Sequence, residues 1–340
     1  MSDSKKAFWE EKNSSFLKAT PDCDLLHPAL KAANTSPTLT ETQFFGFSIP
    51  EEKIHALTYM WHHPNLGIVT GGAWVWQGIK TNVLQSELFN WTNFMSDDAL
   101  KNDLWDYQFE NGYHVTTIEP LKNHRLRFAD PARENFFDVE IEAIMEPMLQ
   151  ANGMHFEQAV KTRGELTLRG KTYKVDGYHV RDRSWGASRS EMHAPSPPID
   201  WMTGVFNENF AFGCTAYDHP DTNPEWKGFQ QVPGGDPTKG GWIYRDGKLI
   251  PIISTVKRGG HDFSSLAPTT IEMTMTDANG RNYELRGEVI VANRFGFWPT
   301  METWICLARW ECEGQVCYGD LQQVQWHDYI REFLNKPPAR

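Results

Sequence analysis

The chain has 340 residues, of which 40% are hydrophobic and 13% aromatic, and this length exceeds what one hydrophobic core usually organises. Its net charge of −11 disfavours a nucleic-acid partner, because a negatively charged protein repels phosphate groups. A local basic patch does not offset this repulsion, since the densest basic stretch, from Arg163 to Arg183, is interrupted by acidic residues. No window approaches the roughly 20 apolar residues of a membrane span, and the first residues lack an apolar signal core. We therefore expect a cytoplasmic, two-domain protein with no integral membrane segment.

Helical patterning is confined to the two ends of the chain and to a short stretch at Asp97–Leu104. Lys5–Lys18 is predicted to form a short helix, and Asn34–Thr40 to form a linker, so residues 1–40 precede the first folded barrel. From Thr42 onward, short strands alternate with turns at regular intervals, which is typical of a β-sandwich or barrel. Residues 41–190 are predicted to form the first barrel. Its expected strands are Thr42–Ile49, Lys53–Trp61, Leu66–Trp76, Lys80–Trp91, Tyr113–Glu119, Arg125–Phe128, Phe136–Met145, His155–Thr162, Glu165–Leu168 and Thr172–Val180.

The second half, residues 191–340, repeats this style and is predicted to form a second barrel. Three hairpins are expected at Asn207–Asn209, Arg245–Gly247 and Asp277–Gly280, the last because an Asn-Gly step accepts positive φ at both residues. The Gly- and Pro-rich stretch His219–Gly241 is predicted to be a loop, and Asp328–Leu334 a C-terminal helix. The expected fold is all-β, with two consecutive antiparallel barrels and short terminal helices.

The sequence contains no motif for a nucleotide or for a metal ion. Glycine-rich phosphate loops, a nucleophile elbow and an HExxH motif are all missing from it. The five cysteines are odd in number, have no CxxC spacing, and are interpreted as reduced, packed thiols. We expect neither a cofactor nor a metal.

Gln158 is the first polar residue predicted to lie on an interior face. In the predicted strand His155–Val160, alternation sends Gln158 to the same face as Phe156 and Val160, which is expected to be the interior. A buried amide needs hydrogen-bond partners. Gln158 is predicted either to orient a substrate oxygen or to satisfy a backbone group at the end of the barrel.

The strand Thr172–Val180 presents two candidate faces for acid–base chemistry. One carries Asp176 and Tyr178, and the other carries Val175 and His179. If the first face lines a cavity, Asp176 is a desolvated carboxyl with Tyr178 as a neighbouring donor. If the second does, His179 is the candidate acid or base. Val175 is apolar, whereas Lys174 lies on the Asp176 face, so His179 is placed ahead of Asp176.

The next residues, Arg181-Asp182-Arg183-Ser184-Trp185-Gly186-Ala187-Ser188-Arg189, predict a tight corner in which guanidinium groups pair with Asp182 and stack on Trp185. Two interpretations stay open for this corner. It is either a structural knot at the mouth of a barrel or part of a catalytic cluster.

This string, preceded by His155-Phe156-Glu157-Gln158, resembles the RDxSWGxR signature of a lipocalin-like superfamily. That superfamily includes carotenoid hydratase (hydroxyneurosporene synthase), tocopherol cyclase, AttH-like proteins and some fungal Diels–Alderases. The resemblance is close over about Gly153–Arg189 and looser over Thr42–Trp91 and Trp201–Trp326, where strand pattern and aromatic style agree. It implies two lipocalin-like barrels with an apolar cavity, and reactions that protonate an alkene, add or remove water, or close a ring.

The leading hypothesis is a cofactor-independent lyase, hydratase, isomerase or cyclase that acts on an isoprenoid-, steroid- or polyketide-like molecule by proton transfer. Such a reaction needs an acid or base and aromatic faces that stabilise positive charge on carbon. The alternative is a non-catalytic carrier of a lipid or pigment. The candidate catalytic residues are His179, Asp176, Tyr178 and Asp182, and the candidate substrate-binding residues are Gln158, Trp185, Trp201, Trp304 and Trp326.

Overall fold

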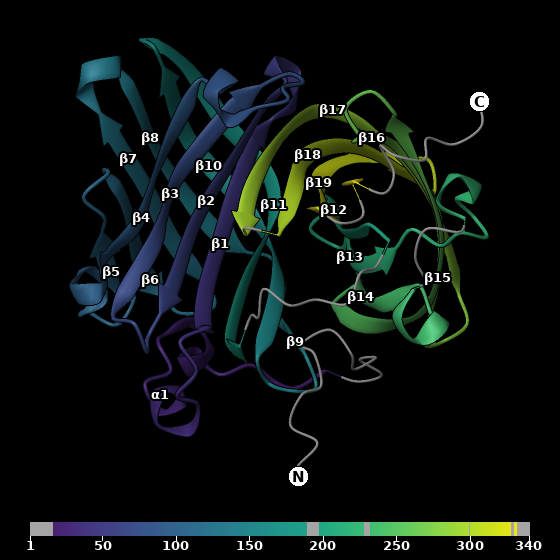
Figure 1. Ribbon diagram of the computed structural model, residues 1–340, viewed down its shortest axis with the longest axis horizontal. Coiled ribbons are helices and arrows are strands. Elements are labelled where there is room, and N and C mark those ends of the chain that lie inside the picture. Colours follow the sequence, from purple (N-terminus) through teal and green to yellow (C-terminus); the bar gives the residue numbers. More distant parts are fainter. Residues whose placement is uncertain (1–15, 189–196, 228–231, 299, 328–329, 332–340) are drawn as a thin grey trace. The chain divides into compact units, whose positions relative to one another are not determined.

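The computed structural model describes residues 16–188, 197–227, 232–298, 300–327 and 330–331 (Figure 1). The chain divides into two compact units. The first spans Leu17–Ser190, and the second contains the chain from Glu191 onward. The predicted helix Lys5–Lys18 falls outside the described residues except at its end, where Leu17 forms a β-bridge with Leu149 instead. Of the predicted C-terminal helix, only Ile330 and Arg331 are described, and both are helical.

The first unit is one antiparallel sheet in the order β4-β3-β2-β1-β11-β10-β8-β7-β6-β5, with β9 paired to β10. This sheet does not close on itself, so β4 and β5 are its two edges (Figure 1). Its strands are β1 (Leu39–Ile49), β2 (Ile54–His63), β3 (Ile68–Gln77), β4 (Leu88–Ser96), β5 (Asp106–Gln108), β6 (Tyr113–Glu119), β7 (Asn123–Asp130), β8 (Asn135–Ala143), β9 (Met148–Leu149), β10 (His155–Leu168) and β11 (Lys171–Ser188).

Alternation along these strands gathers one large hydrophobic core on one face of the sheet. In β1, Phe45 and Phe47 belong to this core together with Ile54 of β2 and Val75 of β3. The helices of this unit are single turns: η1 (Pro21–Asp24), α1 (Ala29–Ala33), η2 (Pro50–Glu52), η3 (Val83–Gln85), η4 (Asp97–Leu100) and η5 (Pro131–Arg133).

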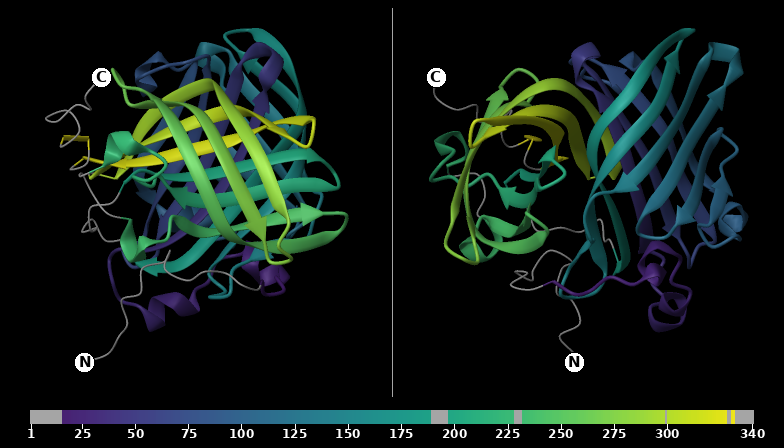
Figure 2. Two further views of the ribbon diagram at one scale, coloured as in Figure 1. Left: turned by 90° about the vertical axis from the view of Figure 1, so that its right-hand side faces the viewer. Right: turned by 180° about the vertical axis from the view of Figure 1, so that it is seen from behind.

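The second unit is a closed antiparallel barrel in which each strand pairs with the next along the chain (Figure 2). β12 and β19 close it through four pairs, from Ile199↔Val324 to Met202↔Leu321. Its elements are β12 (Ile199–Asn207), β13 (Phe210–Tyr217), η6 (Pro224–Trp226), η7 (Pro233–Gly235), β14 (Thr238–Arg245), β15 (Lys248–Asp262), β16 (Ala267–Asp277), β17 (Asn282–Trp298), β18 (Met301–Cys312) and β19 (Gln315–Trp326).

The predicted all-β class with two barrel-like antiparallel units is confirmed, the first unit being open and the second closed. The hairpins predicted at Asn207–Asn209, Arg245–Gly247 and Asp277–Gly280 are also confirmed. The predicted strand Lys80–Trp91 is wrong over its first half. There the Asn82 side chain accepts a hydrogen bond from Leu84 N and begins η3, which competes with strand formation. The predicted loop His219–Gly241 ends early, because β14 begins at Thr238.

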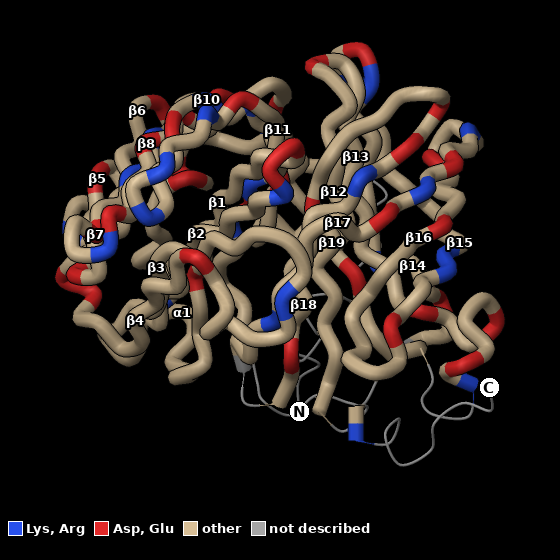
Figure 3. The backbone as a smooth tube through the Cα atoms, turned by 90° about the horizontal axis from the view of Figure 1, so that it is seen from above, with Lys and Arg blue, Asp and Glu red and all other residues tan. Residues whose placement is uncertain are grey.

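Basic and acidic residues are interspersed along the described chain of both units (Figure 3). In β7 and β8, for example, Arg125 forms an ion pair with Asp138, its nitrogen and oxygen 2.7 Å apart. Among the described residues, no helix combines the length and the apolar character needed to cross a membrane.

Candidate functional site

The Arg-Asp-Arg-Ser-Trp motif lies at the end of β11 and holds the segment that precedes β1. Arg181 donates two hydrogen bonds to Asp24 of η1, Nη1 to Oδ1 at 2.7 Å and Nη2 to Oδ2 at 3.0 Å. Both side chains are almost completely buried, with 1% and 0% exposed. The Asp24 carboxylate also accepts from Leu121 N, and His124 Nε2 lies 3.0 Å from Oδ2.

The second arginine of the motif completes this clamp. Arg183 Nη2 donates to Leu25 O and lies 3.5 Å from Glu41 Oε2. Glu41 in turn accepts from the backbone N–H and the ring Nδ1 of His27. The His27 ring stacks on Trp185 with centroids 4.3 Å apart. The motif therefore fastens residues 24–27 to β11, and we call these contacts the Asp24–Arg181 clamp.

Gln158 is part of the same clamp. Its Oε1 accepts from Arg181 Nε, and its Nε2 donates to the backbone carbonyls of Leu121 and Met145. Of the two roles left open for this amide, these contacts match the bonding of backbone groups. Its role in binding a substrate stays a prediction, as does that of Trp185.

The ionised state of the clamp follows from its charges. Burial alone raises the pKa of Asp24, but Arg181 and His124 outweigh it, so the pKa lies well below its ordinary value. Burial also raises the pKa of Glu41, but its hydrogen bonds to His27 and the charge of Arg183 outweigh burial, so the pKa is lowered. Burial lowers the pKa of His124. The clamp thus pairs two buried carboxylates with two guanidinium groups.

Three of the predicted catalytic residues are exposed or half-buried. Asp176 is exposed, and it forms ion pairs with Lys174 and Lys161. The bond to Lys174 lowers its pKa, which is the opposite of the desolvated acid that the first arrangement required. Tyr178 is half-buried beneath the Lys161 ammonium, and Asp182 is half-buried opposite Phe44 and Glu157.

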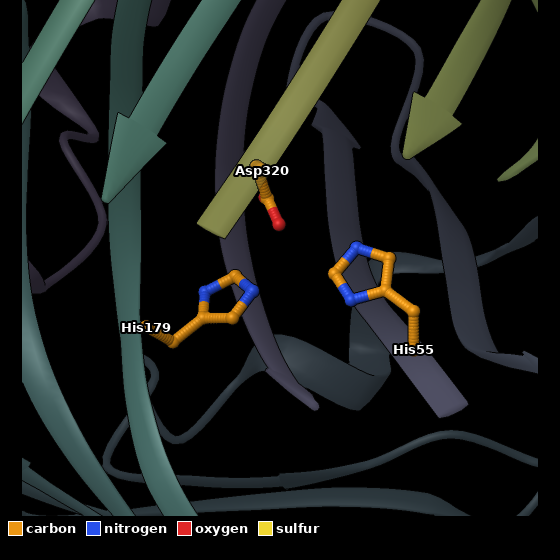
Figure 4. A group of neighbouring side chains, drawn as sticks. All are labelled: His55, His179 and Asp320. Atoms are coloured by element: carbon orange, nitrogen blue, oxygen red, sulfur yellow. The ribbon is translucent and has the colours of Figure 1, made fainter. Parts of the chain in front are cut away.

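His179 has a different setting. It is buried, as is Val175, in agreement with the second of the two faces considered. β1 pairs with β11 only as far as Phe44↔Asp182, and beyond that point the His179 ring lies beside Phe44 and His55. The His179 and His55 centroids are 5.9 Å apart with planes 24° from parallel, and Figure 4 shows the two rings side by side. The edge of Trp76 packs on the other ring, His55.

Two contacts fix the orientation of the His179 ring. Its Nδ1 lies 2.8 Å from Val180 O, and because a carbonyl only accepts, Nδ1 carries a proton. In the neutral ring, Nε2 is then the acceptor atom. Gly46 makes room for the ring, since a Cβ there would lie 2.4 Å from His179 Cε1. Imidazole nitrogens also bind transition metals, so the expectation of no metal stays a prediction.

The three tryptophans of the second unit that were predicted to bind substrate lie in two places. Trp304 is in the core of the closed barrel, where its indole N–H has no hydrogen-bond partner among the described residues. Trp201 and Trp326 pack outside that core, in an apolar cluster with Ile199 and Tyr217.

The closed barrel also contains a buried ionic network that the sequence analysis missed. Lys257 of β15 donates to Asp200 of β12 and to Asp218, which directly follows β13, at 2.6 Å for the latter. Gln323 of β19 donates to Asp200 Oδ1, and His261 Nε2 lies 2.9 Å from Gln323 Oε1. All five side chains are buried. We call this group the Lys257 network.

In the network, the two carboxylates repel each other and both attract the ammonium group of Lys257. Burial and the nearby Asp218 raise the pKa of Asp200. Burial alone lowers the pKa of Lys257, but the two carboxylates outweigh it and the net direction is upward. Lys257 is therefore an ammonium ion at neutral pH and is unsuited to attack as a free amine.

Sequence reasoning missed His55 and Lys257 for related reasons. His55 lies in an alternating strand, and nothing in its local pattern indicates that β2 lies near β11. For Lys257, a signal was present, since Thr255, Lys257 and His261 share one face of a long strand. That face could be recognised as the interior only once the barrel was known to close.

A family model described as a domain of unknown function, DUF7064, matches residues 21–330. The chain belongs to the DUF7064 family. The comparison with curated proteins gives no match. Among solved structures, kievitone hydratase from Nectria haematococca is similar at 12% identity with a TM-score of 0.54, over 96% of this chain and 100% of that one. A putative AttH from Nitrosomonas europaea is similar at 11% identity with a TM-score of 0.51, over 84% and 92% respectively.

These two similarities show that this DUF7064 protein shares its fold with kievitone hydratase and with the AttH protein. The motif-based relation to the lipocalin-like superfamily stays a prediction. The relation to carotenoid hydratase and tocopherol cyclase stays a prediction.

Proposed function

We propose that the protein is a hydratase-type lyase that adds water to, or removes it from, a carbon–carbon double bond of an apolar small molecule, with His179 moving the proton. The observation that carries this proposal is the fixed tautomer of His179, with Nδ1 bonded to Val180 O and the ring beside His55. A base held in one orientation inside a buried aromatic setting suits proton transfer. The fold shared with kievitone hydratase supports the reaction class.

In the proposed hydration, His179 Nε2 accepts a proton from water as the water oxygen bonds to one alkene carbon. Protonated His55 gives a proton to the other carbon, so that H and OH are added and no electrons are exchanged with a carrier. Dehydration is the reverse. The same pair would also serve an isomerisation or ring closure, in which one residue takes a proton from one substrate carbon and the other residue gives a proton to another.

The experiment uses the full chain with kievitone as the first probe, because the hydratase of similar fold is named for that compound. The product is examined by mass spectrometry for the gain of one water, before and after treatment with EDTA. We expect turnover to survive EDTA. His179→Gln should slow turnover by about a hundredfold or more, whereas Asp176→Asn, an exposed position on the same strand, should leave the rate unchanged.

Full turnover by His179→Gln would contradict the proposal. If kievitone is not converted, native mass spectrometry of the purified protein identifies a co-purified small molecule, and the same variants are tested on it. A molecule that the wild-type chain binds and never converts would favour the alternative, a lipid or pigment carrier.

A further inference from the structure

A second group of polar side chains lies within the first unit, where β1 and β11 pair. Gln43 of β1 and Arg183 of β11 are directly opposite each other in the sheet, and both are fully buried. The Tyr107 hydroxyl, from β5, donates to Gln43 Oε1 at 2.8 Å. Three strands thus bring an amide, a guanidinium group and a phenol together.

Several donors in this group have no hydrogen-bond partner among the described residues. They are Nε and Nη1 of Arg183 and Nε2 of Gln43. The remaining nitrogen of Arg183, Nη2, is taken by Leu25 O and Glu41, and Gln43 Oε1 is taken by Tyr107. The polar groups of Gln43 and Arg183 that lack a partner among the described residues are therefore all N–H donors.

Buried N–H groups without acceptors are costly, and native proteins satisfy nearly all of them. The cost is greatest for a guanidinium group, which keeps its charge at any physiological pH. An oxygen atom that accepts hydrogen bonds would remove this cost. The geometry of the group is therefore that of a receptor for an acceptor oxygen.

The charges around Gln43 and Arg183 favour a neutral ligand oxygen over a charged one. Arg183 faces Glu41, which is ionised, and Arg181 is paired with Asp24. Each cation has its own anion, so a carboxylate ligand would add an unbalanced negative charge to a buried site. A neutral carbonyl oxygen satisfies the donors without that charge.

An open cavity of about 490 Å³ lies in the same unit. It is lined by Met95, Ser96, Ala99, Gln108, Phe109 and Glu110. The ring of Phe109 packs on Tyr107 with centroids 5.2 Å apart, and Tyr107 bonds Gln43, so contacts run from the lining of this cavity to Gln43. The volume is within the range of small-molecule sites.

We propose that Gln43 and Arg183, with Tyr107 positioning the amide, form a binding site for the carbonyl oxygen of a neutral, aromatic small molecule whose remaining part occupies the cavity at Phe109. This site goes beyond the proposed hydratase reaction, since it includes neither His179 nor His55 and does not require their chemistry.

The test measures binding of benzophenone, a neutral aromatic ketone, to the full chain by isothermal titration calorimetry. Diphenylmethane, which lacks the oxygen, and diphenylacetate, which carries a carboxylate, are the comparison probes. We expect benzophenone to bind at least about tenfold more tightly than either. Gln43→Met should weaken benzophenone binding by about tenfold and leave diphenylmethane binding unchanged.

Tyr283→Phe, in the second unit, is the matched control, because that buried hydroxyl donates to Asp277 Oδ2 and its removal should change neither affinity. If Gln43→Met fails to fold, the carbonyl ¹³C shift of labelled benzophenone bound to the wild-type chain reports hydrogen bonding directly. Equal affinity for benzophenone and diphenylmethane, or no binding of either, would overturn the proposal. His179→Gln should bind benzophenone as the wild type does, which separates this test from that of the hydratase.

Discussion

At the scale of single residues, Gly46 determines where His179 can lie. A Cβ at this position would approach His179 Cε1 to 2.4 Å, His179 Nε2 to 2.5 Å and Ala56 O to 2.9 Å. We expect Gly46→Ala to displace the imidazole and to lower the free energy of unfolding by about 1–3 kcal/mol, the usual cost of overpacking. Urea denaturation followed by tryptophan fluorescence measures this change.

Gly177 is the control, because it belongs to β11 and a Cβ there makes only ordinary contacts, the nearest at 3.7 Å. Gly177→Ala should be neutral or slightly stabilising, since alanine loses less conformational freedom in a strand than glycine does. Equal destabilisation by both variants would show that the His179 ring does not depend on Gly46.

Residue-level prediction from the sequence reached half of the candidate site. Alternation in the strand Thr172–Val180 correctly separated exposed Asp176 from buried His179. It could not find His55, since periodicity describes one strand and the partner of His179 comes from a strand far away in the sequence. Gln43 was missed for the same reason.

At the scale of elements, the Asp24–Arg181 clamp ties η1 to β11 by charges that depend on pH. Asp24 and Glu41 both have pKa values below their ordinary 3.8 and 4.5. Folding therefore gains stability from these carboxylates above their ordinary pKa values. That stability is lost as the pH falls, because the unfolded chain then binds protons that the folded chain does not.

We expect the free energy of unfolding to decrease as the pH is lowered through and below 4.5, and the decrease to be shallower in Asp24→Asn. At neutral pH, Asp24→Asn leaves the guanidinium of Arg181 buried without its counter-charge and should cost about 3–5 kcal/mol. Denaturation curves at several pH values measure both effects.

Asp138→Asn is the comparison, since Asp138 pairs with Arg125 where both side chains are partly exposed. Its cost should lie between zero and about 1 kcal/mol. A cost for Asp24→Asn no larger than this would contradict the role given to the clamp. The sequence motif predicted a corner of paired charges around Asp182. Arg181 and Arg183 pair with Asp24 and Glu41, and no local pattern shows these acids, since Asp24 lies 157 residues before Arg181.

At the scale of the whole molecule, turn chemistry and strand alternation were enough to predict two antiparallel units, because each hairpin is a local event. Closure was not predictable in this way. Whether β4 meets β5, or β12 meets β19, depends on the accumulated twist and stagger of all strands between them. The Lys257 network could therefore not be predicted from the sequence, because its residues meet only when the barrel closes. It contributes to the stability of the second unit.

We expect Lys257→Met to destabilise the second unit by about 3–5 kcal/mol, because Asp200 and Asp218 then remain buried together without a cation. Replacing all three as Asp200→Asn, Asp218→Asn and Lys257→Met should restore most of the loss. Lys122→Met, at an exposed lysine, should change little. Chemical denaturation followed by near-UV circular dichroism measures all three, and a triple variant as unstable as Lys257→Met would contradict the account.

The pairing of β12 with β19 also decides the order in which the second unit can assemble. Every other pair in this barrel joins neighbours along the chain, so those hairpins can zip as soon as their strands are synthesised. β12 ends at Asn207 and β19 begins at Gln315, which leaves an edge of β12 unpaired until all the intervening chain has emerged. Such long-range closure is slow. Gln323 of β19 and Asp200 of β12 bond across this seam, so this hydrogen bond can form only after the hairpins between the two strands, at the step that closes the barrel.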